Sequence, residues 1–182
     1  MKNIFKVLLV GLLFLSLSSV AGAEEWKKVE LPAGVMLEIQ IPEGFSTVEV
    51  DKGATGNFGS IFMNQESKTM IVVKKGTDFL ESDFPEELRK KMTGKYPFDS
   101  LTSDEEQEFL KKVLKQGEAY QFVTLPNGHR AMRGFDGQGK LQAYLMIQMV
   151  DQYVVGVAVV KEGEFTEAET KMTDEIFKRT KI

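Results

Sequence analysis

Hydrophobic and polar residues alternate along several short stretches of the chain, which is the pattern of β-strands with one face in a core. Three aliphatic residues alternate with Glu and Gln over residues 37–41, and residues 45–50 are predicted to form another short strand. Apolar runs over 60–64 and 68–73 are separated by three polar residues and predict a hairpin. The first half of the chain is therefore expected to form mostly antiparallel strands.

The second half of the chain shows the same alternation in longer strands. A turn over residues 126–128 is expected to join strands over 120–125 and 129–135. Residues 141–149 place an apolar side chain at every second position, whereas residues 153–160 are apolar on both faces. A strand of the second kind must be covered on both sides, so the sheet is expected to carry a layer on each face.

Two helices are predicted from capping boxes, in which a Ser or Thr and a Glu three residues later satisfy each other's free backbone N–H groups. Ser103–Glu106 is the first such segment, and a helix is predicted over residues 104–116. Thr166–Glu169 is the second, before a helix whose buried stripe includes Ile176 and Phe177. Each helix carries one apolar face with which it can cover a sheet.

A shorter helix is expected within the irregular segment 76–101, with Pro85 at its first turn and with Leu88 and Met92 on its buried side. The two longer helices are the natural covers for the two faces of the sheet. The predicted fold class is α+β, with an α/β/α sandwich around a mostly antiparallel sheet. The length of the chain suits a single domain.

The first 23 residues have the composition of a secretory signal peptide. A basic start with two lysines precedes an apolar run over residues 7–17, and small residues follow up to Ala23. The apolar run is shorter than the ~20 residues of a membrane-spanning helix. We therefore expect cleavage of residues 1–23 and an exported single domain over residues 24–182, with an uncleaved N-terminal anchor as the alternative.

The absence of cysteine and the balance of charge narrow the class of protein further. Without cysteine the exported domain has no disulfides and no attachment point for a lipoprotein lipid, so no stable membrane anchor is expected after cleavage. The periplasm is favoured over the medium.

The formal net charge of −4 becomes −6 when the two leader lysines are lost. An acidic domain repels nucleic acid and anionic lipid, so a nucleic-acid partner is not expected.

No combination of residues predicts an enzyme, a metal site or a cofactor. His129 is the only histidine and is interpreted as a solvated residue at the start of a strand, because nucleophilic triads and most transition-metal sites need further residues. Gly134–Lys140 has the spacing of a P-loop, but Leu141 stands where Ser or Thr would hold magnesium. Met146 and Met149 fall on opposite faces of a strand, so they cannot jointly bind copper(I). Acidic pairs fall in the first turns of helices, where the helix dipole favours them.

Four aromatic residues in the irregular segment 76–101 are the candidate partner-binding surface: Phe79, Phe84, Tyr96 and Phe98. Aromatic side chains in a long irregular connection can form a binding surface. The alternative is that they fold back onto the sheet as a satellite hydrophobic cluster.

The segment Ile41–Phe45 (IPEGF) resembles the I-P-x-G-F/W opening of the PsbP and Mog-type fold family, which includes DcrB-like bacterial envelope proteins. The order of the predicted elements also matches this family: an early hairpin, a mid-chain helix, a late antiparallel meander and a final helix. Two features depart from the family, because Pro97 splits its helix after the first hairpin and the lipid-anchoring cysteine of DcrB-like members is missing. The resemblance implies a binding or accessory module of unassigned role, and it carries no catalytic residue onto this chain.

The function predicted from the sequence is that of an exported, non-enzymatic envelope module that binds a protein or a hydrophobic peptide. The alternative is a periplasmic carrier that holds a small molecule or lipid in a pocket between sheet and helix. A hydrolase is the least favoured class, because no motif places a nucleophile beside a base.

Overall fold

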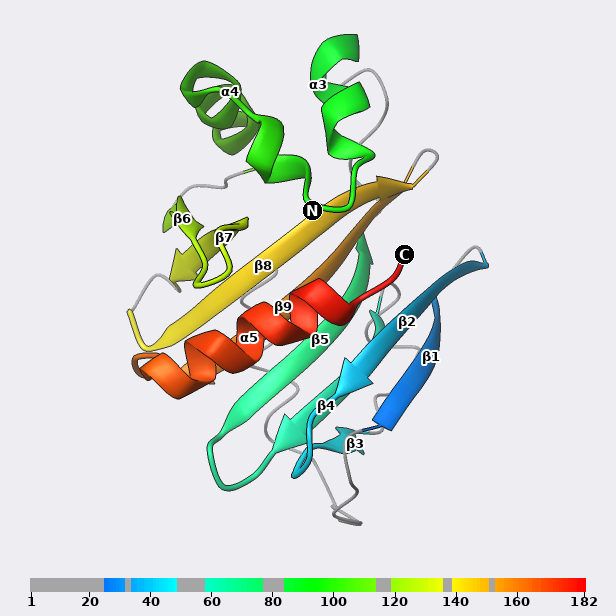
Figure 1. The fold of residues 1–182 in the computed structure, drawn as a ribbon, viewed down its shortest axis with the longest axis vertical. Coiled ribbons are helices and arrows are strands. Elements are labelled where there is room, and N and C mark those ends of the chain that lie inside the picture. The colour runs from blue at the N-terminus through cyan, green and yellow to red at the C-terminus, as the bar shows by residue number, and fades with distance from the viewer. Residues whose placement is uncertain are drawn as a thin grey trace.

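The structure is a computed structural model that describes most of the chain from residue 25 onward (Figure 1). The described residues are 25–31, 34–48, 58–76, 84–113, 119–135, 139–150 and 153–182. The strands are β1 (Glu25–Leu31), β2 (Val35–Ile41), β3 (Ser46–Val48), β4 (Phe58–Asn64), β5 (Thr69–Gly76), β6 (Ala119–Thr124), β7 (Arg130–Phe135), β8 (Leu141–Val150) and β9 (Tyr153–Glu162). The helices are α3 (Glu86–Met92), the 3-10 helix η3 (Pro97–Ser100), α4 (Ser103–Val113) and α5 (Glu167–Arg179). The predicted signal peptide lies outside the described residues.

Seven strands form one antiparallel sheet in the order β3-β4-β5-β9-β8-β7-β6. The last strand in the chain, β9, lies inside this sheet and pairs with β5 on one side and β8 on the other. Val155 and Val157 of β9 are buried in one core cluster, whereas Val154 and Val160 are buried in the clusters of the opposite face. The strand predicted over residues 153–160 and its burial on both faces are confirmed.

Both predicted hairpins are present in this sheet. β4 pairs with β5 in antiparallel register, and β6 pairs with β7. In the second turn the N–H of Gly128 donates to the carbonyl oxygen of Leu125 at 2.9 Å. Gly128 has a φ of 91°, a backbone conformation that glycine adopts without a steric cost. The strand predicted over residues 45–50 is described only in part, as the three-residue β3.

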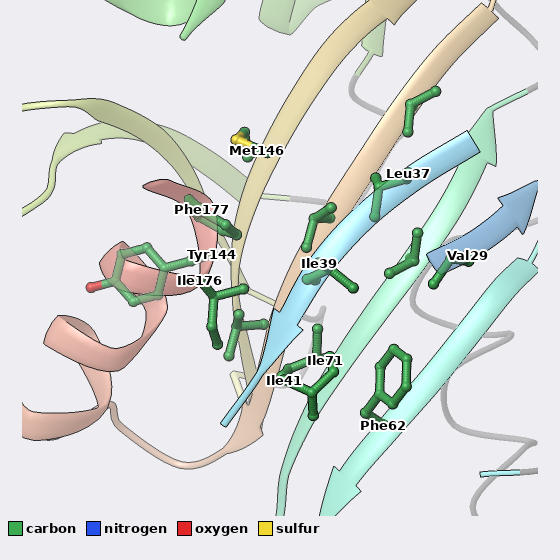
Figure 2. Packing of buried hydrophobic residues seen from close by; sticks show 14 of the residues in the cluster. Val29, Leu37, Ile39, Ile41, Phe62, Ile71, Tyr144, Met146, Ile176 and Phe177 are labelled. Atoms are coloured by element: carbon green, nitrogen blue, oxygen red, sulfur yellow. The ribbon is translucent and has the colours of Figure 1, made fainter. Parts of the chain in front are cut away.

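Helices cover both faces of the sheet, as the predicted α+β sandwich requires. On one face Ile176 and Phe177 of α5 pack against Tyr144 and Met146 of β8 in the main hydrophobic cluster (Figure 2). On the other face α3, η3 and α4 pack against β7, β8 and β9. Met149 belongs to this second cluster, so Met146 and Met149 point to opposite faces of β8 as predicted.

The strand predicted over residues 37–41 does not join the main sheet. It pairs only with β1 among the described strands, and this hairpin packs beside α5 over the same face of the main sheet (Figure 1). The contact with β4 is close, because a Cβ added to Gly59 would lie 2.3 Å from Cδ2 of Leu31. A β-bulge lies beside this glycine in the pairing of β4 with β5. The small sheet is thus a second layer that the sequence pattern did not reveal.

One of the two predicted capping boxes is confirmed and the other is displaced by one residue. At α5 the Thr166 side chain accepts from the backbone N–H of Glu169, and the Glu169 carboxylate accepts from the backbone N–H of Thr166. At α4 the reciprocal pair is Thr102 and Glu105, whose carboxylate accepts the Thr102 N–H at 2.7 Å. Glu106, the expected partner of Ser103, instead forms an ion pair with Arg130.

Candidate binding surface and the polar cluster beside it

Two of the four aromatic residues predicted to form a partner-binding surface lie in the hydrophobic core. Phe84 and Phe98 are buried, with exposures of 4% and 0%. The Phe98 ring packs edge-on against Phe109 and Phe122, with centroids 5.7 and 5.0 Å away. These two residues therefore form a satellite core, the alternative considered above, and the surface assignment is wrong for them. Phe79 lies outside the described residues, and Tyr96 alone of the four is described and partly exposed.

The large hydrophobic side chains that remain exposed in the described residues are Trp26 and Met36, at 46% and 51%. Both project from the outer face of the β1–β2 hairpin, because Trp26 pairs with Gln40 and Glu30 pairs with Met36 in the antiparallel register. The inner face of the same hairpin is buried in the main cluster. Sequence analysis did not single out either residue, and only their position on one face of the hairpin distinguishes them.

The C-terminal end of α5 holds this outer face in place. The backbone groups of Glu38 and Lys181 form two hydrogen bonds of 2.8 Å, which extend the pairing of β2. Arg179 donates to the side-chain oxygen of Gln40 at 2.7 Å. The Lys181 ammonium lies 4.6 Å from the centre of the Trp26 ring, a cation–π distance. The residues at and just after the end of α5 therefore contact both strand β2 and the exposed tryptophan.

A polar cluster lies at the C-terminal half of α5, and we call it the clasp: Tyr96, Asp99, His129 and Asp174. The Tyr96 and His129 rings stack with centroids 3.6 Å apart and an interplanar angle of 7°. The Nδ1 atom of His129 lies 2.6 Å from one Asp99 carboxylate oxygen, and the other oxygen accepts the backbone N–H of Arg130 at 2.7 Å. His129 is therefore paired and stacked rather than simply solvated, which corrects the sequence interpretation.

Asp174 connects the clasp to α5. It is 4% exposed, and its Oδ2 atom accepts the backbone N–H of Asn127 at 2.8 Å. Its Oδ1 atom is buried and has no hydrogen-bond partner within the described part of the chain. Burial raises the pKa of the Asp174 carboxyl above its ordinary value, against the opposing effect of the Asn127 hydrogen bond. Burial also raises the pKa of the Tyr96 hydroxyl, and the carboxylates of Asp174 and Asp99 add to this rise.

Metal-ligating groups and membrane-spanning helices were both sought among the described residues. No group of three or more His, Asp and Glu side chains among them could hold a metal ion. Within the same residues no helix is long and apolar enough to cross a membrane. Gly134, the first glycine of the P-loop-like spacing, lies inside strand β7 and not at the start of a helix.

The fold has known counterparts, although no family model matches the sequence and no curated protein matches it. The solution structure of cyanobacterial PsbP (CyanoP) from Synechocystis sp. PCC 6803 is similar, with a TM-score of 0.50 and 12% identity, covering 92% of this chain and 97% of that one. The Ran-binding protein Mog1p of Saccharomyces cerevisiae matches with a TM-score of 0.44 and 14% identity, covering 87% of this chain and 96% of that one. The similarity to CyanoP shows that the chain has a PsbP-type fold, as its resemblance implied. The DcrB-like part of that resemblance stays a prediction.

Proposed function

We propose that this chain is an exported, non-enzymatic module of the bacterial envelope that binds a protein partner through the outer face of the β1–β2 hairpin. The observation that supports this function is the exposure of Trp26 and Met36 on one face of that hairpin. Tryptophan and methionine are enriched in protein interfaces, and tryptophan is the residue type most often found at energetic hot spots. A partner that covers these two side chains would gain most of its affinity from them.

The spacing of the two side chains suits a flat or extended partner. Four residues of strand separate their positions along the hairpin, which corresponds to about 13 Å at the usual rise. Glu38 lies between them, 3.5 Å from the Lys28 ammonium and 3.6 Å from the Lys181 ammonium. Because Glu38 is paired with both lysines, a partner can cover the face without leaving this carboxylate unpaired. The face therefore offers two apolar anchors around a charged, ion-paired centre.

The hairpin is also held rigidly enough to act as an interface. Its inner face is part of the main core, and its free side is tied to the C-terminal residues by backbone and side-chain hydrogen bonds. Little conformational freedom remains to be lost on binding, which favours affinity. The predicted signal peptide supports export, and we favour the periplasm as the place of binding. No structural observation favours the carrier alternative, and side chains fill the described contact between α5 and the sheet (Figure 2).

The proposal can be tested by site-specific crosslinking followed by affinity measurement. A photo-crosslinking amino acid is placed at Met36 of the full-length protein in cells, and the crosslinked protein is identified by mass spectrometry. The partner is then purified, and its Kd is measured for the wild type and for Trp26→Ala. We expect Trp26→Ala to weaken binding by about 30-fold, the effect of losing a 2 kcal/mol hot spot.

Two controls separate the surface from general effects on folding. Gln107 is exposed on α4, away from the hairpin, and a crosslinker at that position should not yield the same adduct. Lys111→Ala, also on the exposed side of α4, should leave the Kd within about twofold, as expected for a residue outside a hot spot. If Trp26→Ala binds as tightly as the wild type, the partner uses another surface and this assignment is wrong.

A further inference from the structure

Strand β1 pairs with no described strand other than β2, which leaves it one open edge. The contacts of β2 show which backbone groups point to that edge. The N–H and C=O of Glu38 both bond to Lys181, on the side of β2 away from β1. Because Glu38 is the register partner of Lys28, these two residues form a pair without hydrogen bonds between them. The N–H and C=O of Lys28 therefore point to the open edge, and by alternation so do those of Trp26 and Glu30.

The open edge of β1 carries a row of hydrogen-bonding groups that the described part of the molecule does not use. The backbone N–H and C=O groups of Trp26, Lys28 and Glu30 have no hydrogen-bond partner there. Strand β1 is also the outermost strand of its layer, on the far side of β2 from α5 (Figure 1). An edge of this kind is a template to which another strand can add.

The charges along this edge favour one particular added strand. Lys28 and Glu30 are exposed on the same face of β1, on either side of the buried Val29. Charged side chains on an edge usually discourage pairing with unrelated strands. A second copy of β1 is different, because a two-fold axis through Val29 sets each Lys28 directly opposite Glu30 of the second copy. The edge is therefore complementary in charge to itself.

The neighbouring antiparallel registers lack this complementarity. An axis through Lys28 sets the two Lys28 side chains opposite each other, and an axis through Lys27 does the same for Lys27. Like charges directly opposite each other destabilise a strand pair, whereas opposite charges stabilise it. The axis through Val29 also brings the two Val29 side chains together on the apolar inner face. One register is thus preferred on both faces of the strand.

We propose that two copies of this chain associate through antiparallel pairing of their β1 strands, which joins the two hairpins into one sheet in the order β2-β1-β1-β2. Each of the two Lys28–Glu30 pairs contributes both of its backbone hydrogen bonds and an ion pair. The Lys28 ammonium, 3.5 Å from Glu38 of its own chain, then bridges two carboxylates. Because few residues of each chain take part, the dimer is weak and depends on concentration.

The dimer extends the surface used by the proposed function. The outer faces of both hairpins lie on the same side of the joined sheet, with the two Trp26 positions about 20 Å apart along the strands, six residues at the usual rise. A partner with two equivalent sites binds both faces with a higher apparent affinity than one face alone. This consequence rests on the proposed function, whereas the dimer itself is tested without any partner.

Sedimentation equilibrium of the purified protein, from about 10 μM to about 1 mM, measures the association. We expect a monomer–dimer equilibrium within this range. Glu30→Lys replaces both attractive pairs by pairs of lysines and should raise the dimer Kd by at least about tenfold. Glu167→Lys makes the same change of charge on the exposed first turn of α5, far from β1 (Figure 1). This control should leave the Kd within about twofold of the wild type.

A mixture of two charge variants tests the register. Glu30→Lys and Lys28→Glu each repel a second copy of themselves, because both cross-strand pairs then join like charges. One copy of each variant restores a lysine opposite a glutamate at both positions. The equimolar mixture should therefore dimerise far more tightly than either variant alone.

Because the chain has no cysteine, introduced thiols report the same register directly. Lys28→Cys mixed with Glu30→Cys should form an intermolecular disulfide readily, since directly opposite Cα atoms in a hydrogen-bonded pair lie about 5.5 Å apart. Lys28→Cys alone should crosslink slowly, because its two copies are displaced by two residues along the strands and lie beyond about 7 Å.

The outcomes separate the dimer from the proposed function. A protein that stays monomeric up to about 1 mM, or a dimer Kd that Glu30→Lys leaves unchanged, would overturn the proposal. A mixture of charge variants that fails to associate, or equal crosslinking of the single and mixed cysteine variants, would overturn the pairing through β1. Each of these results leaves the crosslinking test at Met36 unaffected, so the proposed function stands or fails by itself.

Discussion

The ring of Tyr120 lies directly over Gly134 of the neighbouring strand. A Cβ added to this glycine would lie 2.2 Å from the Cε1 atom and 2.6 Å from the Cδ1 atom of the tyrosine. The two residues are partners in the β6–β7 register. The aromatic ring covers the backbone that the glycine leaves open, and in this way it packs at the edge of the sheet between two hydrophobic clusters.

Gly134→Ala should therefore destabilise the protein by about 1–3 kcal/mol, the usual cost of overpacking a well-packed site. The free energy of unfolding in urea measures this effect. Gly156→Ala is the matched control, because a Cβ at this β9 glycine meets its nearest neighbour, Cδ1 of Leu145, at 3.5 Å. That substitution should cost less than about 0.5 kcal/mol, or stabilise the protein slightly. Equal effects at the two glycines would contradict the close contact with Tyr120.

The start of α4 gives a second prediction, because Thr102 and not Ser103 provides its reciprocal cap. Thr102→Ala should lower the free energy of unfolding by about 1 kcal/mol, a typical value for loss of an N-cap side chain. Ser103→Ala should change it by only a few tenths of a kcal/mol. Thermal denaturation of the wild type and of the two variants in the same buffer measures these changes in stability. A larger loss of stability in Ser103→Ala than in Thr102→Ala would show that Ser103 is the cap, as the sequence alone predicted.

A third prediction concerns stability in acid. Burial opposes ionisation of Glu169, but hydrogen bonds from Lys161 and Thr166 outweigh it and hold the pKa of Glu169 below its ordinary value. A carboxyl with a lowered pKa stabilises the fold above its unfolded pKa, and this stabilisation is lost as the pH falls through the folded pKa. Lys161→Met should therefore destabilise the protein at pH 7 by about 1–2 kcal/mol, between the values of exposed and buried pairs.

The same variant should lose much of the wild type's slope of stability below pH 5, because the lowered pKa of Glu169 depends on the lysine. Lys171→Met is the control, since its partner Glu167 on the same helix is 83% exposed. Its effect at pH 7 should stay within about 0.5 kcal/mol. Indistinguishable acid-unfolding midpoints for the wild type and Lys161→Met would show that the Lys161–Glu169 pair does not stabilise the fold.

Most of the main sheet could be predicted because its signals are local. Alternation, turn residues and an uninterrupted apolar strand all lie within short windows, and β9 is buried on both faces as its composition indicated. The cap of α4 shows the limit of such signals. Thr102 with Glu105 and Ser103 with Glu106 both fit the capping-box pattern. In the structure Glu106 is paired with Arg130 of strand β7, a contact that the local sequence does not reveal.

The candidate surface and the clasp could not be predicted for a related reason. The His129–Asp99 contact joins residues 30 positions apart, and no periodic pattern marks either residue. Burial of Phe98 and exposure of Trp26 depend on which elements pack together, because an aromatic residue in an irregular segment and one in a short strand look alike in sequence. The small β1–β2 sheet was missed because its placement over the main sheet depends on long-range packing, including the close approach at Gly59.

The position of β9 also governs the order in which the molecule can be completed. Strands β3 to β5 and strands β6 to β8 form two separate halves of the sheet, and only β9, near the end of the chain, joins them by hydrogen bonds. A ribosome must therefore release residues 153–162 before the halves can close into one core. Long-range pairing of this kind delays completion of the sheet until β9 has been made. A nascent chain built in this order stays open while it is made, and an exported protein would be handed to a translocation channel in that state.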